Sequence, residues 1–358
     1  MVKKLLVTLV VLLLTCLLFS LAAAEGNGAD RTVVDMKGKT IILPESIDSY
    51  CVLYSSAVPF CAMMDENLQH MVLYPVSNYF EYWYTLMFEG INDHALQVDK
   101  KNVTAEQILE SGAQVVFWNR AAHEELIASL EAAGIACVNV QITNSEDLLR
   151  TIHVIADTFG TEFAQEKAQA YDEKYHIYLK SAIEHANQIP DDEKKTVLVI
   201  GSVDNPTVGA IDSYQGYWTN LTGLINLTPV KAGEPQSTLT MEEIYEIDPD
   251  IIIAQGPFNR DNINNDTNWK EVRAVKENML FSNPSVLDEW GMPTSEAPLQ
   301  FIWVLKQFYS QYAEDIDASA ELISFYKDFY NYEITQEKAD AILSCHHFYL
   351  HPALQEME

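Results

Sequence analysis

Basic side chains are scarce in this sequence. The 358 residues include 22 Lys and Arg against 52 Asp and Glu, which gives a formal net charge of −30. A surface of this charge repels nucleic acid and anionic lipid, so we expect neither as a partner. Only five residues are arginine, and two of them, Arg120 and Arg260, follow apolar runs that are typical of buried strands. Their placement is more informative than the overall charge.

The motifs of common enzyme classes are also lacking. There is no G-x-S-x-G nucleophile elbow, no H-E-x-x-H, no glycine-rich phosphate loop and no EF-hand spacing. His123-Glu124 resembles the start of a zinc-protease helix, but Ile127 stands where the second histidine would have to be. The C-terminal tail holds soft metal ligands whose spacing fits no closed zinc site: Cys345, His346, His347 and His351. We therefore expect neither catalytic residues nor a metal site.

Cysteine is sparse as well. Four cysteines remain after residue 24, too few and too scattered for a disulfide framework in a chain of this length. Cys51 and Cys137 lie in apolar runs and are expected to be buried thiols. A disulfide between Cys51 and Cys61 is the alternative.

Long apolar runs are confined to the N-terminus. Two lysines precede an apolar core from Leu5 to Leu21, and three alanines ending at Ala24 provide a cleavage site. We interpret residues 1–24 as a signal peptide cleaved after Ala24, so that the protein is exported to the periplasm or the cell surface. The alternative, a lipid anchor at Cys16, is disfavoured by Thr15, a poor residue before a lipidated cysteine. No later run is long and apolar enough to span a bilayer.

One stretch of the sequence occurs twice. Thr104–Arg120 reads TAEQILESGAQVVFWNR, and Thr240–Arg260 reads TMEEIYEIDPDIIIAQGPFNR. In both copies a threonine that can cap a helix is followed two positions later by an acidic residue, Glu106 or Glu242. An apolar run typical of a parallel strand buried on both faces comes next, and each copy ends in a loop with Asn-Arg. The repeat predicts two similar, Rossmann-like α/β lobes with mostly parallel central sheets.

The segment between the copies predicts a stiff connection. Residues 161–189 contain neither glycine nor proline and are closed by Pro190, which predicts a single long helix of roughly 40 Å. We expect an N-terminal lobe over residues 25–158, this inter-lobe helix, and a C-terminal lobe over residues 195–358. A β-hairpin over residues 31–44 should cover an edge of the first sheet.

Two aromatic segments are expected to be loops. Residues 74–84 hold six Tyr, Trp and Phe side chains without a clear helical or strand period, and residues 209–218 form a second such segment. We expect part of both to line a ligand site, with a buried core cluster as the alternative. The candidate residues are Tyr79, Tyr82, Tyr214, Tyr217 and Trp218, together with Tyr54, Ser55, Ser56 and Trp118 at the ends of two strands.

The order of these elements resembles the solute-binding proteins of ABC importers for iron siderophores, cobalamin and haem. The resemblance is carried by the opening hairpin, both copies of the repeat, the segment SEAPLQFIWVLKQFY and the closing FYKDFYNYEIT, and it covers nearly the whole chain after residue 24. It implies two lobes joined by one rigid helix, with the ligand in a cleft between them, beyond the carboxyl ends of the strands. Arg120 and Arg260 would approach this cleft from opposite lobes and bind ligand oxygen atoms.

The resemblance also implies a ligand and a partner. A ferric siderophore is the first choice as ligand, and haem, a corrinoid, molybdate, tungstate and a nickel chelate are alternatives. Glu106 and Glu242 match the acidic residues, one on each lobe, with which this class docks on the dimeric membrane permease. We expect a monomer without a cofactor. The rival interpretation is an exported chelatase-like enzyme, whose chemistry would require a histidine or carboxylate reaching the cleft.

Overall fold

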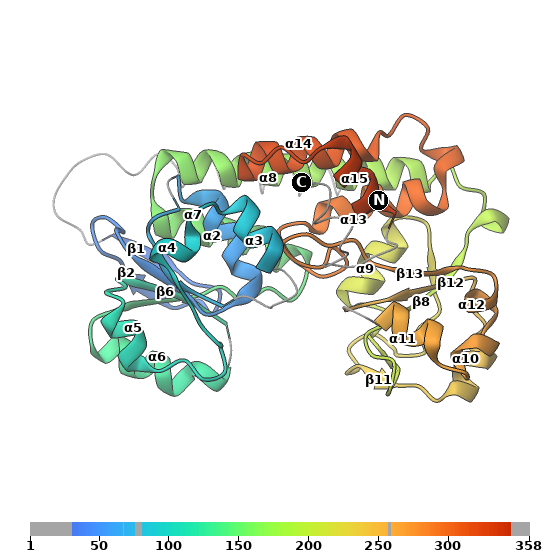
Figure 1. The fold of residues 1–358 in the computed structure, drawn as a ribbon, viewed down its shortest axis with the longest axis horizontal. Coiled ribbons are helices and arrows are strands. Elements are labelled where there is room, and N and C mark those ends of the chain that lie inside the picture. Colours follow the sequence, from blue (N-terminus) through green and yellow to red (C-terminus); the bar gives the residue numbers. More distant parts are fainter. Residues whose placement is uncertain (1–30, 67, 76–80, 120, 257–258, 345–358) are drawn as a thin grey trace, which may run out of the picture. The chain divides into compact units, whose positions relative to one another are not determined.

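In the part of the chain that the structure describes, two parallel β-sheets organise the fold, one in each half (Figure 1). The computed structural model describes residues 31–344 except residues 67, 76–80, 120 and 257–258. The first sheet has the strand order β5-β4-β3-β6-β7 and the second has the order β10-β8-β12-β13. All pairs within both sheets are parallel. The predicted class of two α/β lobes is therefore confirmed.

The first sheet and its helices alternate along the chain. The elements are β3 (Tyr50–Val52), η1 (Ser55–Ala57), α2 (Val58–Met64), β4 (Met71–Tyr74), α3 (Glu81–Met87), α4 (Ile91–His94), β5 (Leu96–Gln97), α5 (Ala105–Glu110), β6 (Val115–Trp118), η2 (Ala121–His123), α6 (Glu124–Ala132), β7 (Ala136–Asn139) and α7 (Ser145–Phe159).

The opening hairpin lies where it was expected. Strand β1 (Thr32–Val34) pairs antiparallel with β2 (Thr40–Ile42). The hairpin contacts the edge strand β7, and the backbone N–H of Met36 donates to the Asn139 carbonyl (3.1 Å). It therefore covers one edge of the first sheet, as predicted.

Helix α8 (Glu162–Ala186) is the predicted inter-lobe helix. The Thr161 side chain caps its N-terminus by accepting from the Ala164 N–H, and Gly160 ends the preceding helix with φ 67°, a left-handed conformation that glycine adopts without strain. Its 25 residues give a length of about 38 Å. Helix α14 (Ala318–Tyr330) lies alongside α8 in Figure 1, and Tyr178 Oη on α8 donates to Glu321 on α14 (2.6 Å).

The second half of the chain follows the same alternation. Its elements are η3 (Asp191–Glu193), β8 (Thr196–Ile200), β9 (Thr207–Val208), α9 (Tyr214–Leu221), β10 (Ile225–Asn226), β11 (Ser237–Thr238), α10 (Met241–Ile247), β12 (Ile251–Ala254), α11 (Asn259–Asn265), η4 (Trp269–Glu271), α12 (Arg273–Lys276), β13 (Leu280–Ser282), α13 (Ala297–Phe308), η5 (Ser310–Tyr312), α14 (Ala318–Tyr330) and α15 (Gln336–Leu343).

Each sheet is buried on both faces, which explains its nearly continuous apolar strands. Val52 of the first sheet and Val199 of the second belong to one central core, together with side chains of α8, α13 and α14. Their neighbours Cys51 and Leu198 belong instead to separate outer cores, each covered by the helices of its own lobe. The shared central core makes the described part of the two lobes a continuous packed unit.

The two copies of the repeat occupy equivalent places in the two sheets. Each copy is a helix, α5 or α10, followed by a strand, β6 or β12, that pairs with the first strand of its sheet. Thr104 and Thr240 both form a capping box, with Gln107 and Glu243 as the reciprocal partners. The internal repeat predicted from the sequence is therefore confirmed in structure.

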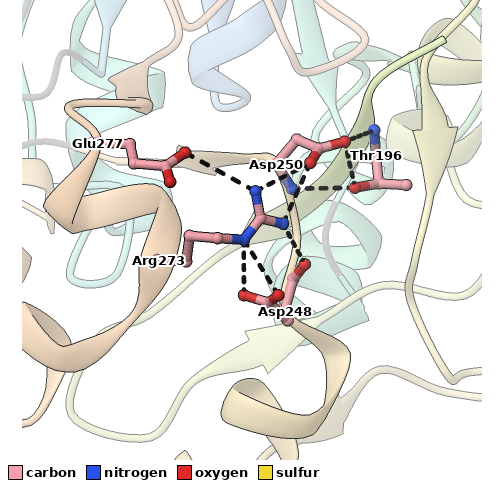
Figure 2. A network of polar contacts seen from close by, with 5 residues as sticks. All are labelled: Thr196, Asp248, Asp250, Arg273 and Glu277. Carbon is pink, nitrogen blue, oxygen red and sulfur yellow. Dashed lines mark hydrogen bonds and ion pairs between the residues drawn. The ribbon is translucent and has the colours of Figure 1, made fainter. Parts of the chain in front are cut away.

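A polar network closes the amino ends of β8 and β12 (Figure 2). Arg273 Nε donates to both carboxylate oxygens of Asp248 (3.0 Å), and its Nη atoms donate to Asp250 (3.1 Å). The other Asp250 oxygen accepts from the backbone N–H and the hydroxyl of Thr196 (2.8 Å each). Glu277 lies 3.8 Å from Arg273. These contacts fix the end of the second sheet opposite to its carboxyl edge.

Three local predictions need correction or completion. Both aromatic segments are partly helical, because α3 and α9 begin within them. The second Asn-Arg pair, Asn259-Arg260, begins helix α11 and is not in a loop. Cys51, Cys61 and Cys137 are free and buried, so the thiol interpretation is confirmed and the alternative disulfide is not formed.

Candidate functional site

Polar groups from three strands meet at the carboxyl edge of the first sheet. Ser55 follows β3, Lys100 follows β5 and His123 follows β6. Lys100 Nζ donates to Ser55 Oγ (2.7 Å), and His123 Nε2 donates to the Lys100 carbonyl (2.8 Å). A lysine held between a serine hydroxyl and a fixed backbone is a donor group suited to an anionic ligand.

An irregular segment, residues 282–296, reaches this group from the second lobe. It follows the edge strand β13 and is almost completely buried. Tyr171 Oη on α8 donates to the Ser295 carbonyl (2.8 Å) and anchors the segment to the inter-lobe helix. Between residues 282 and 305 only Asp288 and Met292 are not buried. The segment therefore presents two side chains, an acid and a thioether.

Asp288 connects the two lobes. Its carboxylate accepts from the Glu289 N–H (2.8 Å) of its own segment, and Ser56 and Lys100 of the first lobe both act on it electrostatically. Burial raises the pKa of Asp288, although the hydrogen bonds and the nearby Lys100 charge act in the opposite direction. Burial also raises the pKa of Tyr54 to about 12, so this phenol is a neutral donor at physiological pH.

Two neighbouring acids hold the segment in place. Glu289 accepts from the Gly256 N–H (2.9 Å) at the end of β12 and from Asn283 Nδ2 (2.7 Å). Glu296 accepts from the Leu287 N–H (3.0 Å) and from the Tyr326 hydroxyl. Burial raises the pKa of each glutamate to about 7.

The carboxyl edge of the second sheet carries amide donors. Gln255 directly follows β12, and Gln215 lies in the first turn of α9. Both donate from Nε2 to Met292 Sδ at 3.3 Å. Asn259 Nδ2 donates to the Gly201 carbonyl, just beyond β8 (3.3 Å). Amide groups from three elements thus surround the carboxyl ends of β8 and β12.

Some predicted ligand residues belong to this group. Of the three residues after β3, Ser55 accepts from Lys100 Nζ, Ser56 interacts with the Asp288 carboxylate, and Tyr54 interacts with Ser56. Tyr82 and Tyr217 are half-buried, and the Tyr217 hydroxyl lies 3.4 Å from that of Tyr175.

Other predicted ligand residues lie in the core. Trp218 is fully buried, and its Nε1 donates to the Gly291 carbonyl (3.1 Å). Tyr214 is also buried and packs against the Tyr217 ring. Trp118 is buried below Lys37, whose Nζ lies 4.6 Å from its ring centroid. These three side chains have almost no exposed surface with which to contact a ligand, so they act here as parts of the core.

Of the two predicted arginines, Arg260 contacts the edge strand of the second sheet. Arg260 Nε donates to the carbonyl of Leu280 (3.1 Å), the first residue of β13, so this nitrogen lies level with the beginning of that strand and not beyond its end. Arg120 and Tyr79 lie outside the described residues. A ligand role for these residues stays a prediction.

The predicted docking residues are accessible. Glu106 and Glu242 are exposed in the first turns of α5 and α10. Because each helix leads directly into a parallel strand and runs back along it, its N-terminus lies towards the carboxyl edge of its sheet. The two glutamates are therefore equivalent positions on the ligand side of their lobes.

The sequence did not single out Lys100, Asp288, Gln215, Gln255 or Met292. A helix-capping Ser213 before Gln215 and the position of Gln255 directly after an apolar strand were visible signals. Nothing local indicated that Asp288 and Met292 would be the surface of a buried irregular segment.

Comparison with known proteins identifies the family. The model of the periplasmic binding protein family matches residues 99–287, which is more than half of the chain. The chain belongs to this family. As in the predicted class, it is a solute-binding protein of the ABC-transporter type and not an enzyme, which sets the chelatase-like interpretation aside.

Individual relatives extend the match over both lobes of this binding protein. It is 25% identical over 350 residues to the molybdate-binding protein MolA of Haemophilus influenzae, covering 89% of this chain and 95% of the relative. The molybdate-bound MolA structure aligns with a TM-score of 0.73 at 20% identity, over 86% of this chain and 99% of that one. A periplasmic solute-binding protein of Veillonella parvula aligns with a TM-score of 0.70 at 22% identity, over 88% and 97%.

A siderophore-binding structure shares the fold at greater distance. FeuA of Bacillus subtilis, the triscatecholate siderophore binding protein complexed with ferri-bacillibactin, aligns with a TM-score of 0.58 at 22% identity, over 78% of this chain and 98% of that one. Among the described residues of the binding protein, no helix is long and apolar enough to cross a membrane. The predicted signal peptide and Cys16 lie outside the described residues.

Proposed function

We propose that this binding protein captures a small tetrahedral oxyanion of the molybdate or tungstate type and delivers it to an ABC permease. The observation that carries the proposal is the Lys100–Ser55 pair, a charged and a neutral donor joined at 2.7 Å at the carboxyl edge of the first sheet. Open parallel sheets bind ligands at this edge. The similarity to MolA, named as molybdate-binding, supports the same ligand class.

Burial of the aromatic residues supports a small ligand over a large one. The expectation of a ferric siderophore came from the resemblance to the family, and the aromatic segments favoured a large ligand in addition. Tyr84, Tyr214 and Trp218 are buried, and Trp83 is 1% exposed. A bulky chelate would need such rings at the surface, whereas an oxyanion needs hydrogen-bond donors.

A ferric siderophore is the second candidate ligand. Tyr82 and Tyr217 keep part of their rings accessible, and the neighbour FeuA is named as a ferric-siderophore binder. In this case Arg120 would add a charged donor for catecholate or hydroxamate oxygens.

Calorimetric titration with molybdate, tungstate, sulfate, a ferric tris-catecholate and haem would separate the candidates. We expect molybdate or tungstate to bind with Kd below about 10 μM, or about −7 kcal/mol. Tight binding of the ferric chelate alone would replace the oxyanion by the second candidate. If none of the five binds, the proposed ligand class is wrong.

We infer the permease as partner, with Glu106 and Glu242 as docking residues. Both are exposed, and each lies in the first turn of an equivalent helix. Two equivalent carboxylates suit two equivalent basic sites on a dimeric permease. Export by the predicted signal peptide, cleaved after Ala24, would bring the protein to the outer face of that membrane.

A further inference from the structure

Met292 is an exposed side chain in an otherwise buried stretch. It is 38% exposed, while residues 282–305 are buried apart from Met292 and the half-buried Asp288. The backbone just before it is tightly packed, because a Cβ on Gly291 would lie 2.2 Å from Asn283 Nδ2. The segment thus holds the thioether in a defined place at the surface.

Two amide groups converge on this thioether from different elements. Gln215 on α9 and Gln255 after β12 both donate to Met292 Sδ at 3.3 Å. A thioether sulfur is a weak acceptor, so each amide donor has a poor partner. An oxygen with a full negative charge would be a much stronger acceptor for the same N–H groups.

The backbone positions that carry the two amides are fixed, and Met292 is the partner that holds the amide groups themselves. The Gln255 N–H donates to the Ile200 carbonyl at the end of β8 (2.8 Å), and Glu289 fixes the next residue, Gly256. The helix that carries Gln215 is pressed onto the preceding loop, because a Cβ on Gly216 would lie 1.9 Å from the Ile211 carbonyl oxygen. Only glycine permits this approach. The two donors therefore start from fixed backbone positions and already point at one place, the Met292 sulfur, which lowers the cost of ordering them around a ligand.

We propose that Gln215 and Gln255 are the ligand-binding donors of the C-terminal lobe. When a tetrahedral oxyanion binds, its oxygen atoms replace the weak acceptor Met292 Sδ as the hydrogen-bond partners of the two amides. This inference rests on the proposed function, because it names the groups that bind the same ligand on the second lobe. Lys100 supplies a positive charge and Ser55 a neutral hydroxyl from the first lobe, and the glutamines supply neutral, directional hydrogen bonds from the second.

The test is calorimetric titration of molybdate and tungstate into the full-length mature protein and its variants. Gln215→Met and Gln255→Met keep the side-chain volume but remove the donors, and each is expected to weaken binding about tenfold. The double variant should weaken it by more than either single change, about 10- to 100-fold, because two amides that bind the same ligand need not act independently. Met292→Leu removes the competing acceptor and should leave affinity equal or up to about fivefold tighter. Gln188→Ala, an exposed glutamine on the C-terminal side of α8, is the matched control and should bind like the unaltered protein.

A second readout follows Met292 itself. In protein labelled with ¹³C at the methionine methyl groups, the Met292 resonance, assigned by its loss in Met292→Leu, should shift on addition of molybdate. Unaltered affinity in the double variant, or an unshifted Met292 resonance at saturation, would overturn the inference while leaving the oxyanion proposal intact. Absence of oxyanion binding by the unaltered protein would overturn both, and titration with the ferric tris-catecholate would then show whether the second candidate ligand holds.

Discussion

Thr104 and Thr240 close the same capping box on two helices that occupy equivalent places in the two lobes. Replacing either threonine by alanine removes the acceptor for a backbone N–H in the first helical turn. We expect each change to lower the free energy of unfolding by about 1 kcal/mol. Urea denaturation followed by circular dichroism measures this, with Thr240→Ser as the control that keeps the hydroxyl. Equal destabilisation by serine and alanine would show that the cap is not the cause.

The glutamates behind these caps give a prediction about the partner. In Glu106→Ala combined with Glu242→Ala, stimulation of the ATPase of the reconstituted transporter should fall by at least about tenfold, because docking loses two charge pairs. Ligand affinity should stay unchanged. Glu110→Ala combined with Glu246→Ala alters exposed residues one turn further along the same helices and is the matched control. An equal loss in the control pair would mean that overall charge, and not these positions, drives docking.

The repeat predicted the two lobes correctly because its signals are local in the sequence. A capping threonine indicates where a helix begins, and the apolar run that follows indicates a strand buried on both faces. Each signal depends only on residues close to it in the sequence. The helix predicted over residues 161–189 was also evident from the sequence, because this run contains no helix breaker and is flanked by Gly160 and Pro190. These signals are sufficient for the lobes, the parallel sheets and the inter-lobe helix.

The prediction that both aromatic segments are loops was wrong because each segment contains the beginning of a short helix. In α9 the buried pair Tyr214 and Trp218 has the four-residue spacing of one helix face, and Ser213 caps the helix. In α3 the buried residues Trp83, Tyr84 and Met87 are flanked by further aromatic residues that hide the helical period. Aromatic density alone did not distinguish core from ligand surface.

The candidate site was only partly predictable. Ser55 and Ser56 directly follow an apolar strand, so their position was visible in the sequence. Asp288 and Met292 depend on a segment without regular structure, whose burial is decided by contacts with distant residues such as Tyr171 and Tyr326. No local period encodes such contacts, and a single sequence does not reveal them.

Lys100 and Asp288 should affect an anionic ligand in opposite directions. Lys100→Met removes the positive charge beside Ser55 and should weaken molybdate binding by about 1.5–3 kcal/mol. Asp288→Asn removes a negative charge but keeps a hydrogen-bonding side chain next to Ser56, and should strengthen binding by about 1 kcal/mol. Calorimetric titration measures both, with the exposed neighbour Lys101→Met as control. Changes of the same sign would argue against an anion at this position.

His153 and Asp172 give a pH-dependent contribution to stability where α7 meets α8. The hydrogen bond to Asp172 raises the pKa of His153, and the same bond lowers the pKa of Asp172. A raised histidine pKa stabilises the folded state below the unfolded value of about 6.5, and this contribution is lost as the pH rises through the folded pKa. Asp172, whose pKa is lowered, stabilises the folded state only while it is ionised. The stabilisation by this pair is therefore lost again as the pH falls below about 4.

We therefore expect His153→Ala to lose most stability between about pH 4 and pH 6.5 and least above pH 8. Urea denaturation across this range measures the difference from the unaltered protein. Asp172→Asn should show the same window, although it also removes the contact with His176 (3.0 Å). A pH-independent difference in both variants would assign the effect to packing alone.

Glu289 should make the protein less stable as the pH rises. Burial raises its pKa from 4.5 to about 7, so the folded state binds the proton more tightly than the unfolded state. Its contribution to stability is therefore complete below about pH 4.5, falls as the pH rises to about 7, and is constant above that value.

The variant Glu289→Gln tests this, because it keeps the shape of the side chain without a titrating group. It places an amide N–H against one of the donors, Gly256 or Asn283, and should lower the free energy of unfolding by about 1–3 kcal/mol at pH 4.5. Because only the unaltered protein loses the Glu289 contribution at higher pH, the gap between the two should narrow up to pH 7, as measured by urea denaturation. Glu296, whose pKa burial also raises to about 7, titrates in both proteins and cancels in the difference. A gap that stays constant from pH 4.5 to pH 8 would mean that Glu289 is ionised throughout, held by its bonds to Gly256 and Asn283 against the effect of burial.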